Sequence, residues 1–416
     1  MRTMMRSMYS GVSGLRTHQL RMDVIGNNIA NVNTPGYKKS RAVFKDAFYQ
    51  AVRGGSAATD SRGGTNPMAI GLGVGLSSVD VIATPGSAQT TGKNTDLSID
   101  GNGYFILANG DERFFTRAGA FDFDVLGNFC NTSNGFRVMG YMADPVTGQI
   151  DTTQAIAPID ISGFKQVAPN PTTVMRFGGN LTSTTAVAGT IVTSKDIYDS
   201  LGNVHTMYTR FTKTGDNTWQ YDVSDDPAFS STLLTGTLAF DENGSVDTAA
   251  STDGGVPVLS YTPDGGAADM SVDLDLTRLT QYNATSTGWV EYQDGYTKGD
   301  LRSLSIDQNG TIQGVFSNGE TKNLARVALA TFQNPAGLLA KGGNLFQVSN
   351  NSGDANIGAP GEQAMGAVLP GTLEMSNVDL SEEFTDMIVT QRGFQANSRI
   401  ITTSDEMLQE LVNLKR

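Results

Sequence analysis

The N-terminal part of the chain carries a helical pattern of hydrophobic positions that stops abruptly. Mostly apolar residues recur at alternating steps of four and three, the spacing of helices that pack along their lengths. From residue 8 onward these positions are Met8, Val12, Leu15, Gln19, Met22, Gly26 and Ile29. Pro35 removes a backbone donor and disfavours helix in the residue before it, and Gly36 permits positive φ. We therefore expect a helix that ends near residue 32.

The C-terminal part of the chain repeats this spacing. The positions are Leu380, Phe384, Met387, Gln391, Phe394, Ser398, Ile401, Asp405, Leu408 and Val412. Candidate N-cap residues precede the pattern, and two glutamates fall in the first turn, where the helix dipole favours negative charge: Ser376, Asn377, Asp379, Glu382 and Glu383. Because both patterns include polar or small residues, the two helices alone would make a weak pair.

Between the two helical segments the pattern changes to short strands joined by tight turns. An Asp-x-x-Gly motif recurs five times, with its aspartate at Asp100, Asp124, Asp199, Asp241 and Asp307. In such a turn the aspartate accepts hydrogen bonds from the backbone, and glycine takes the positive φ that reverses the chain. Apolar and polar residues alternate over residues 218–223, as expected for a half-buried strand. Several short strands at close spacing predict β-domains of sandwich or barrel type.

The order of these patterns predicts a nested architecture. A composition rich in Thr, Asp, Gly and Ser begins after Pro171 and ends near residues 281–288, which indicates an insertion into a first β-domain. We expect a mixed, mainly β fold, in which nested β-domains accompany a paired N- and C-terminal α-helical coiled-coil domain. The predicted parts are a terminal helical domain (1–32 with 376–416), a linker or arm (33–75), an inner β-domain (76–170 with 287–370) and an inserted outer β-domain (172–286).

Length and composition narrow the functional classes. A chain of 416 residues is long enough for two or three domains. The net charge of −13 disfavours nucleic-acid binding, because phosphates would meet no net positive field. The single cysteine, Cys130, excludes an intramolecular disulfide and is interpreted as a small buried hydrophobe. No secretory signal pattern opens the chain, and no stretch has the roughly 20 apolar residues of a membrane span. We therefore expect no membrane insertion.

Residue patterns for catalysis or cofactor binding are weak. The two histidines, His18 and His205, do not occur in a zinc-site spacing. Residues 11–15 miss the nucleophile-elbow pattern by one position, because Leu15 occupies the place of the second glycine. The turn after Asp124 lacks the later ligands of a calcium loop. We predict that the protein is not an enzyme and has no catalytic, cofactor-binding or metal-binding residues.

Two longer motifs lie at the ends of the chain and carry a resemblance. Residues 27–38 and residues 376–398 resemble the N- and C-terminal signatures of bacterial flagellar axial proteins, the rod, hook and hook-associated subunits. The residues that carry the resemblance are Asn27, Asn28, Asn31, Asn33, Thr34, Pro35, Gly36, Tyr37, Gln391, Arg392, Gln395, Ala396 and Asn397. The terminal segments with these motifs make up about a fifth of the chain.

Interior runs favour one branch of this family. Residues 196–211, 307–320 and 334–338 are similar to runs of hook subunits. The resemblance therefore implies a structural subunit of the flagellar hook, with a distal rod subunit as the nearest alternative. A β-rich surface adhesin, the alternative from another class, would explain the Thr- and Gly-rich middle but not the paired terminal heptads.

The resemblance also implies partners and a location. Hook subunits self-assemble into a curved helical tube, a universal joint that transmits torque from rod to filament in swimming motility. The implied partners are further copies of the chain, the distal rod protein, the hook-capping scaffold protein, the hook–filament junction protein and the flagellar type III export apparatus. The implied location is extracellular, in the hook, after export without a cleaved signal peptide. We expect self-association through Met8, Val12, Leu15, Met22, Ile29, Leu380, Phe384, Met387, Phe394, Ile401, Leu408 and Val412.

Overall fold

The computed structural model describes residues 2–57, 60, 62–145, 147–362 and 365–414. The predicted domains also cover residues 1, 58–59, 61, 146, 363–364 and 415–416, which lie outside the described residues. Within the described residues the fold is mainly β, with one long helix near each end of the chain. The predicted fold class is therefore confirmed.

Two compact units divide the chain. Unit 1 comprises residues 1–162, 304–313 and 323–416, and unit 2 comprises residues 163–303 and 314–322. Unit 2 therefore interrupts unit 1 in the sequence, as expected for an insertion. The exact boundaries of the predicted inner and outer β-domains stay a prediction.

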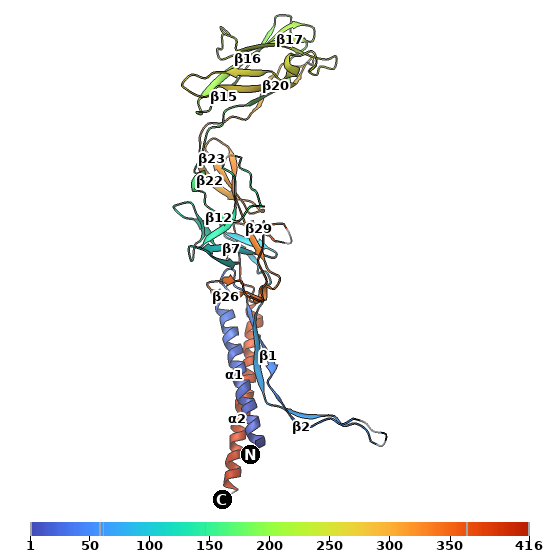
Figure 1. Ribbon diagram of the computed structural model, residues 1–416, viewed down its shortest axis with the longest axis vertical. Helices are drawn as coiled ribbons and strands as arrows, with labels where there is room; N and C mark the ends of the chain where they lie inside the picture. The colour runs from blue at the N-terminus through green and yellow to red at the C-terminus, as the bar shows by residue number, and fades with distance from the viewer. Residues whose placement is uncertain (1, 58–59, 61, 146, 363–364, 415–416) are drawn as a thin grey trace. The chain divides into compact units, whose positions relative to one another are not determined.

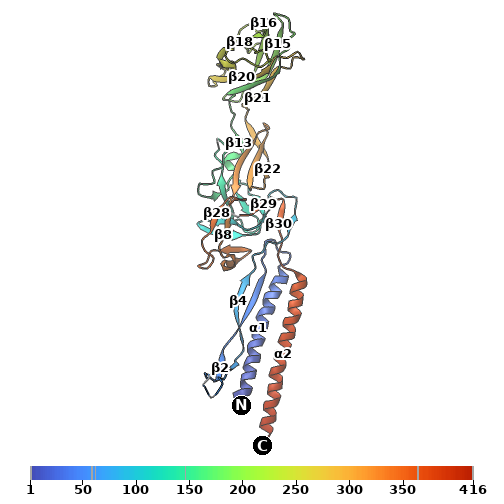
Figure 2. The ribbon, with the colours of Figure 1, turned by 90° about the vertical axis from the view of Figure 1, so that its right-hand side faces the viewer.

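The two terminal helices lie side by side in unit 1. Helix α1 (Arg2–Ala30) and helix α2 (Leu380–Asn413) run antiparallel along most of their length (Figures 1 and 2). Asp379 is the N-cap of α2, because its side chain accepts hydrogen bonds from the backbone N–H groups of Ser381 and Glu382. The predicted N-cap is therefore confirmed.

A long arm follows α1. Strand β1 (Ser40–Asp46) pairs antiparallel with β4 (Val74–Val81), and this ribbon contacts α1 (Figure 2). Farther out, β2 (Tyr49–Arg53) pairs with β3 (Met68–Gly71), and every residue of these two strands is exposed. The predicted linker or arm (33–75) therefore contains β1, β2 and β3, whereas β4 lies mostly beyond its predicted end.

The β part of unit 1 is built on a sheet in which β24 (Thr321–Val327), β11, β7, β8, β27 and β26 are successive neighbours. Phe105 and Leu107 of β7 belong to one hydrophobic core, while Tyr104 and Ile106 belong to another, so the strand is buried on both faces. The strands are β5 (Ala88–Thr90), β6 (Leu97–Asp100), β7 (Tyr104–Asn109), β8 (Glu112–Thr116), β9 (Phe121–Phe123), β10 (Phe129–Asn131), β11 (Arg137–Met142), β12 (Ala157–Pro158), β25 (Leu329–Thr331), β26 (Leu339–Gly342), β27 (Leu345–Gln347), β28 (Asn356–Gly358), β29 (Ala367–Pro370) and β30 (Thr372–Glu374).

Unit 2 contains a β-sandwich. One sheet has the order β15-β16-β17-β18 and the other β19-β20-β14-β21, and side chains from both form a single core. Trp219, Tyr221 and Val223 are all buried in it, as predicted for one face of the strand, but Asp222 on the other face is buried as well. The strands are β14 (Val174–Asn180), β15 (Thr190–Tyr198), β16 (Val204–Gly215), β17 (Thr218–Ser224), β18 (Leu234–Ala239), β19 (Val258–Tyr261), β20 (Met270–Thr280) and β21 (Trp289–Gln293).

The remaining strands lie at or near the boundaries of the two units in the sequence. They are β13 (Gln166–Val167), β22 (Gly299–Ile306), β23 (Thr311–Phe316) and β24 (Thr321–Val327). Three short 3-10 helices complete the described elements, at Ser162–Phe164, Thr252–Gly255 and Pro335–Gly337.

Four of the five Asp-x-x-Gly motifs form the predicted turns. In each, the aspartate side chain accepts backbone hydrogen bonds within the turn, as at Asp124, Asp199, Asp241 and Asp307. The motif glycines have positive φ, for example 104° at Gly127. At the motif that begins at Asp100, two glycines take positive φ instead, 114° at Gly101 and 142° at Gly103.

Candidate functional site

The N-terminal signature residues form a joint where α1 meets the arm and α2. Asn28 lies at its centre: its Nδ2 donates to the Ser40 carbonyl at 2.8 Å and to Glu383 Oε2 at 3.1 Å. Its Oδ1 accepts from the Ser40 N–H at 3.0 Å and from Tyr37 Oη at 3.1 Å. Asn28 is 1% exposed, so one buried amide has partners on α2 and in the segment that follows the turn after α1. An asparagine fits here because its amide both donates and accepts.

The other signature residues of this joint bond to one another. Asn27 Nδ2 donates to Tyr37 Oη at 3.0 Å, and Asn31 Nδ2 donates to the Asn27 carbonyl at 2.9 Å. Thr34 Oγ1 donates to Asn31 Oδ1 at 3.1 Å, whereas Asn33 is exposed. The Pro35 carbonyl accepts from Asn344 Nδ2 at 2.8 Å.

Gly36 is required at this joint by its conformation and by its surroundings. Its φ is 72°, and a Cβ atom would lie 2.4 Å from the Ala118 nitrogen, so any side chain would clash with backbone. Its N–H donates to the Glu374 carbonyl at 2.7 Å. The predicted break after α1 is therefore a packed turn that contacts the β part of unit 1.

A second set of contacts links the joint to the start of the C-terminal signature. The Lys39 N–H donates to Asn377 Oδ1 at 2.7 Å, and Asn377 Nδ2 donates to the Ile82 carbonyl at 2.9 Å. Lys39 Nζ also pairs with Glu382 Oε2 at 2.7 Å. The two signatures, more than 330 residues apart in the sequence, thus hold the same joint.

A buried ionic cluster lies beside the joint, and sequence reasoning missed it. Glu374 accepts from Lys38 Nζ and, at 3.2 Å, from Arg117 Nη1, and all three side chains are at most 3% exposed. The Gly86 N–H donates to the same carboxylate at 2.9 Å. Burial lowers the pKa of Lys38, although the Glu374 carboxylate opposes this shift. No spacing in the sequence connects these residues, because they come from three distant segments.

Within one chain, small and polar residues form the contact between α1 and α2. A Cβ on Gly14 would lie 2.7 to 2.9 Å from the side-chain atoms of Asn397, and one on Gly393 would lie 2.6 Å from the His18 ring. Arg21 pairs with Asp386 at 2.8 Å across the two helices. The contact is therefore made mainly by close approach and hydrogen bonds.

Most of the predicted self-association residues are half-buried, and Ile401 packs against Gly11 within the helix contact. Half-buried members are Met8, Leu15, Met22, Ile29, Met387, Phe394, Ile401 and Leu408. Exposed members are Val12, Leu380, Phe384 and Val412. Further exposed apolar side chains on the two helices are Met5, Tyr9, Leu20, Ile388, Val389, Ile400, Met407 and Leu414. We call the exposed members and these further residues together the apolar helix surface. Four of the predicted residues belong to this surface, and the self-association role stays a prediction.

The C-terminal signature faces solvent for the most part. Gln391, Arg392, Gln395 and Ala396 are exposed on α2. Asn397 is half-buried against Gly14, and its Nδ2 donates to the Gly393 carbonyl at 3.0 Å. The two signatures therefore differ in their surroundings. The N-terminal signature makes contacts within one chain, whereas most of the named residues of the C-terminal signature are exposed to solvent.

The outer ribbon of the arm exposes further apolar side chains. Phe48 is 76% exposed, and Tyr49, Val52, Met68 and Ile70 are also exposed. A lone two-stranded ribbon is at best marginally stable in water. The arm thus offers a second apolar surface in unit 1.

The two histidines lie in different surroundings. His18 lies at the α1–α2 contact, where burial and then the charge of Arg21 lower its pKa. In unit 2, His205 Nε2 lies 3.2 Å from Asp199 Oδ2, and Tyr261 Oη lies 3.3 Å from His205 Nδ1. Asp199 also accepts from the N–H groups of Leu201 and Asn203, so this carboxylate holds a turn together.

Metal and membrane sites were sought in the described residues. Among them, no group of three or more His, Cys, Asp or Glu side chains is placed to hold a metal ion. No helix in this part of the chain is long and apolar enough to cross a membrane. Cys130 is half-buried rather than buried as expected, and burial raises the pKa of its thiol.

Four protein families match segments of the chain. They are described as "Flagella basal body rod protein" (residues 8–38), "Flagellar hook protein FlgE/F/G D1 domain" (98–167), "Flagellar basal body protein FlaE D2 domain" (166–296) and "Flagellar basal body rod FlgEFG protein C-terminal" (369–414). The first and last matches cover the two signatures, and the third covers most of unit 2.

Similar proteins span the whole chain. The flagellar hook protein FlgE of Borreliella burgdorferi is 42% identical over 99% of this chain and 100% of its own length. That of Treponema pallidum is 39% identical with the same coverage. The basal-body rod protein FlgG of Bacillus subtilis is 34% identical over 99% of this chain and 100% of its own. The solved structure of the flagellar hook protein FlgE2 of Helicobacter pylori shares the fold, with a TM-score of 0.53 and 15% sequence identity. The match covers 70% of this chain and 100% of that protein.

Proposed function

The chain belongs to the flagellar hook protein FlgE family and is a structural subunit of the flagellar hook, and from this premise we propose that it self-assembles into a curved helical tube. In this proposal the tube acts as a universal joint that transmits torque from rod to filament. The terminal helices build its inner wall. The apolar helix surface, which one chain leaves exposed, is the observation that carries the proposal.

Exposed apolar area on this scale needs a partner. Phe384 is 50% exposed and Val412 61% exposed, and twelve large apolar side chains are exposed along the two helices, whereas monomeric proteins rarely expose large apolar surfaces. A contact between two different faces of the same chain generates a helical polymer when its repetition does not close into a ring. Copies of this chain, each with the same uncovered helices and arm, are therefore the partners that fit.

Bending during rotation requires neighbouring subunits to slide. Polar contacts suit sliding better than a dry apolar interface, because they exchange with water at small net cost. The chain has 48 glycines and a net charge of −13, which favour polar, loosely packed contacts between the outer β parts. The apolar helices then hold the tube together while the outer contacts rearrange.

Further partners and the location are proposed on the same basis. We expect the distal rod protein below the hook, the hook-capping scaffold protein during growth and the hook–filament junction protein above it. The family description of residues 8–38 refers to rod proteins, which supports compatible helix surfaces along the flagellar axis. The extracellular location, export through the type III apparatus without a cleaved signal peptide, and the absence of enzymatic activity and of cofactors belong to this proposal.

Fewer observations support a distal rod subunit or a surface adhesin than support a hook subunit. The rod protein FlgG is 34% identical to this chain, below the 42% of the first hook protein. An adhesin has no need of an uncovered pair of terminal helices. We therefore keep the hook assignment.

Electron microscopy of concentrated protein tests self-assembly. We expect tubes from the unaltered chain and none from Val12→Ser or Phe384→Ser, because each places a polar group on the apolar helix surface. Leu126→Ser is the matched control: Leu126 is also exposed but lies in a turn of the β part, so this variant should form tubes. Failure of the unaltered chain to polymerise, or normal tubes from both helix variants, would overturn the proposal.

A further inference from the structure

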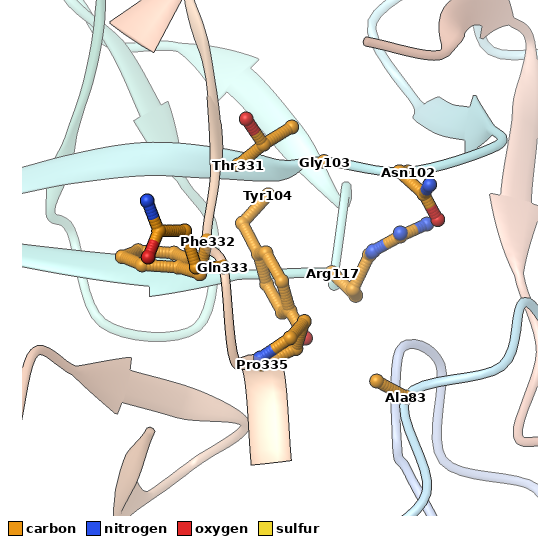
Figure 3. A pocket seen from close by; sticks show the side chains of 9 residues that line it. All are labelled: Ala83, Asn102, Gly103, Tyr104, Arg117, Thr331, Phe332, Gln333 and Pro335. Carbon is orange, nitrogen blue, oxygen red and sulfur yellow. The ribbon is translucent and has the colours of Figure 1, made fainter. Parts of the chain in front are cut away.

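We propose that a cavity beside Arg117, in the β part of unit 1, is a binding site for a carboxylate side chain of a second copy of the chain. The inference rests on the proposed self-assembly and adds a specific contact to it. The cavity has a volume of about 330 Å³ and is lined by Ala83, Asn102, Tyr104, Arg117, Phe332 and Pro335, among others (Figure 3).

The arginine at this cavity is only partly satisfied within its own chain. Arg117 Nη1 donates to Glu374 at 3.2 Å, and Nη2 donates to the Gly101 carbonyl at 2.8 Å. Its Nε is buried and has no hydrogen-bond partner. Leaving a donor of a buried, charged group without a partner is costly. The guanidinium can therefore gain from a further acceptor.

The charge balance around Arg117 also favours an anion. Lys38 and Arg117 share the single carboxylate of Glu374, and the three side chains are almost fully buried. Two cations with one anion leave an excess of positive charge in a region that water screens poorly. A second carboxylate would balance it, and a guanidinium with an unpaired N–H is well suited to bind one.

The residues that line the cavity favour a carboxylate that is attached to an apolar group. The Arg117 guanidinium lies 5.3 Å from the centre of the Tyr104 ring, and Phe332 and Pro335 line another part of the cavity (Figure 3). The volume falls at the lower end of the roughly 300–1,000 Å³ of ligand pockets, so an acidic side chain with its neighbouring backbone fits. A hydrated inorganic anion would leave the apolar walls uncovered.

Charge complementarity identifies the occupant as another copy of this chain. The chain has 42 acidic and 29 basic residues, so its copies present many carboxylates and repel one another in a polymer. A buried site with excess positive charge offsets this repulsion at a defined place. It also selects one register between neighbours, because a misplaced neighbour leaves the arginine unsatisfied.

Titration of the full-length monomer tests the chemistry of the site. Benzoate is the probe, and benzamide, which has nearly the same shape without the charge, is the control. We expect benzoate to shift the NMR signals of the Arg117 Nε–H group and the Tyr104 ring, with benzamide binding about tenfold more weakly, since charged hydrogen bonds are the stronger ones. Arg117→Lys should weaken benzoate binding by a similar factor, because lysine lacks the planar fork.

Assembly of the full-length chain tests the source of the carboxylate. Ala83→Leu fills the cavity without replacing a residue of the ionic cluster, and we expect it to raise the protein concentration needed for polymerisation about tenfold. Ala88→Leu is the control, because Ala88 is exposed and does not line the cavity. A photoreactive amino acid in place of Gln333, which lines the cavity and is exposed, should cross-link to an acidic segment of a second copy in tubes but not in dilute monomer.

The outcomes separate this inference from the proposed function. If tubes form but Ala83→Leu assembles like Ala88→Leu, or the cross-link stays within one chain, the site does not bind a second copy. If benzoate and benzamide bind alike, the cavity does not recognise a carboxylate. If the unaltered chain forms no tubes, self-assembly itself fails, whereas the benzoate titration still decides whether the site takes an anion.

Discussion

At the scale of single residues, the absence of a side chain decides how closely the helices approach. Gly14 and Gly393 each occupy a place where a Cβ would meet a polar side chain of the other helix at under 3 Å. Gly26 lies in the same helix as Gly14, but a Cβ there would have no neighbour within 4 Å. The same residue type is therefore structurally required at one position and replaceable at another.

A pair of glycine variants tests this difference. Gly14→Val should separate α1 from α2 and prevent tube formation while the β parts stay folded, because Asn397 has backbone and packing partners that limit its retreat. Gly26→Ala should assemble normally and stabilise α1 by about 1 kcal/mol, the difference in helix propensity. Circular dichroism of the monomers and electron microscopy of the polymers measure both effects. Normal assembly of Gly14→Val would contradict the close approach of the helices.

A carboxylate in unit 2 gives the fold a pH dependence. Burial opposes ionisation of Asp199, but hydrogen bonds from Asn203, His205 and Leu201 outweigh it and lower the pKa to about 2. Since this pKa lies below the roughly 3.9 of an unfolded aspartate, the stabilisation is present above about pH 4 and is lost as the pH falls through 2.

The Asp199→Asn variant should therefore lose part of this dependence. We expect the urea midpoint of the unaltered protein, followed by fluorescence of the buried Trp219, to fall between pH 5 and pH 2 more steeply than that of the variant. Asp264→Asn, at an exposed position, is the control and should follow the unaltered protein. Parallel curves for all three proteins would contradict the role of Asp199.

At the scale of elements, each terminal helix has two surfaces with different partners. The contact between α1 and α2 includes glycines, hydroxyl groups, the Arg21–Asp386 ion pair and the side chain of Ile401 against Gly11, whereas large apolar side chains such as Phe384 and Val412 are exposed. Helices in proteins gain most of their stability from packing an apolar face. The pair formed within one chain therefore uses the weaker of the two surfaces.

This arrangement predicts that assembly stabilises the helices. In dilute monomer we expect backbone amides over residues 8–30 and 382–410 to exchange rapidly, because ordering costs roughly 1–2 kcal/mol per residue and the polar pair offsets little of it. In the polymer the same amides should exchange slowly, since folding is coupled to binding. Hydrogen exchange on both forms measures this, with the β-sandwich core of unit 2 as the protected reference in each. Slow exchange across both segments in dilute monomer would show that the pair is stable without neighbours.

At the scale of the whole molecule, the two ends of the β-sandwich in unit 2 are neighbours in space. Asn170 and Tyr296 exchange backbone hydrogen bonds of 2.9 and 3.0 Å, and β14 pairs with β21 just beyond them. The insertion predicted over residues 172–286 stops before β21, so in the structure a strand outside the predicted range completes a sheet of the sandwich.

Two deletions locate the boundary. Replacing residues 171–295 by a short Gly-Ser linker should give a soluble, folded protein, because Asn170 and Tyr296 are already neighbours. Deleting residues 172–286 retains β21 without β14, which exposes Val290 and should cause aggregation. Circular dichroism and size-exclusion chromatography compare the two products. An unfolded product from the first deletion would mean that the rest of the chain depends on unit 2.

The sequence by itself determined the features that depend on neighbouring residues. Heptad spacing predicted α1 and α2, the Asp-x-x-Gly turns predicted four reversals, and Pro35 with Gly36 marked the end of the first helical segment. Helix periodicity, capping and turn chemistry act over a few residues, so they can be read without knowledge of the fold. The terminal signatures also pointed to the correct family.

Only the tertiary structure decided which distant residues meet. Heptad spacing marked apolar positions, but it could not tell that Gly14 and Asn397 would form the contact within a chain while Phe384 stays exposed. Lys38, Arg117 and Glu374 look like ordinary surface charges in the sequence, and their burial follows from packing of three segments far apart. Long-range pairing depends on the competition among all segments for the same core, which no local pattern encodes.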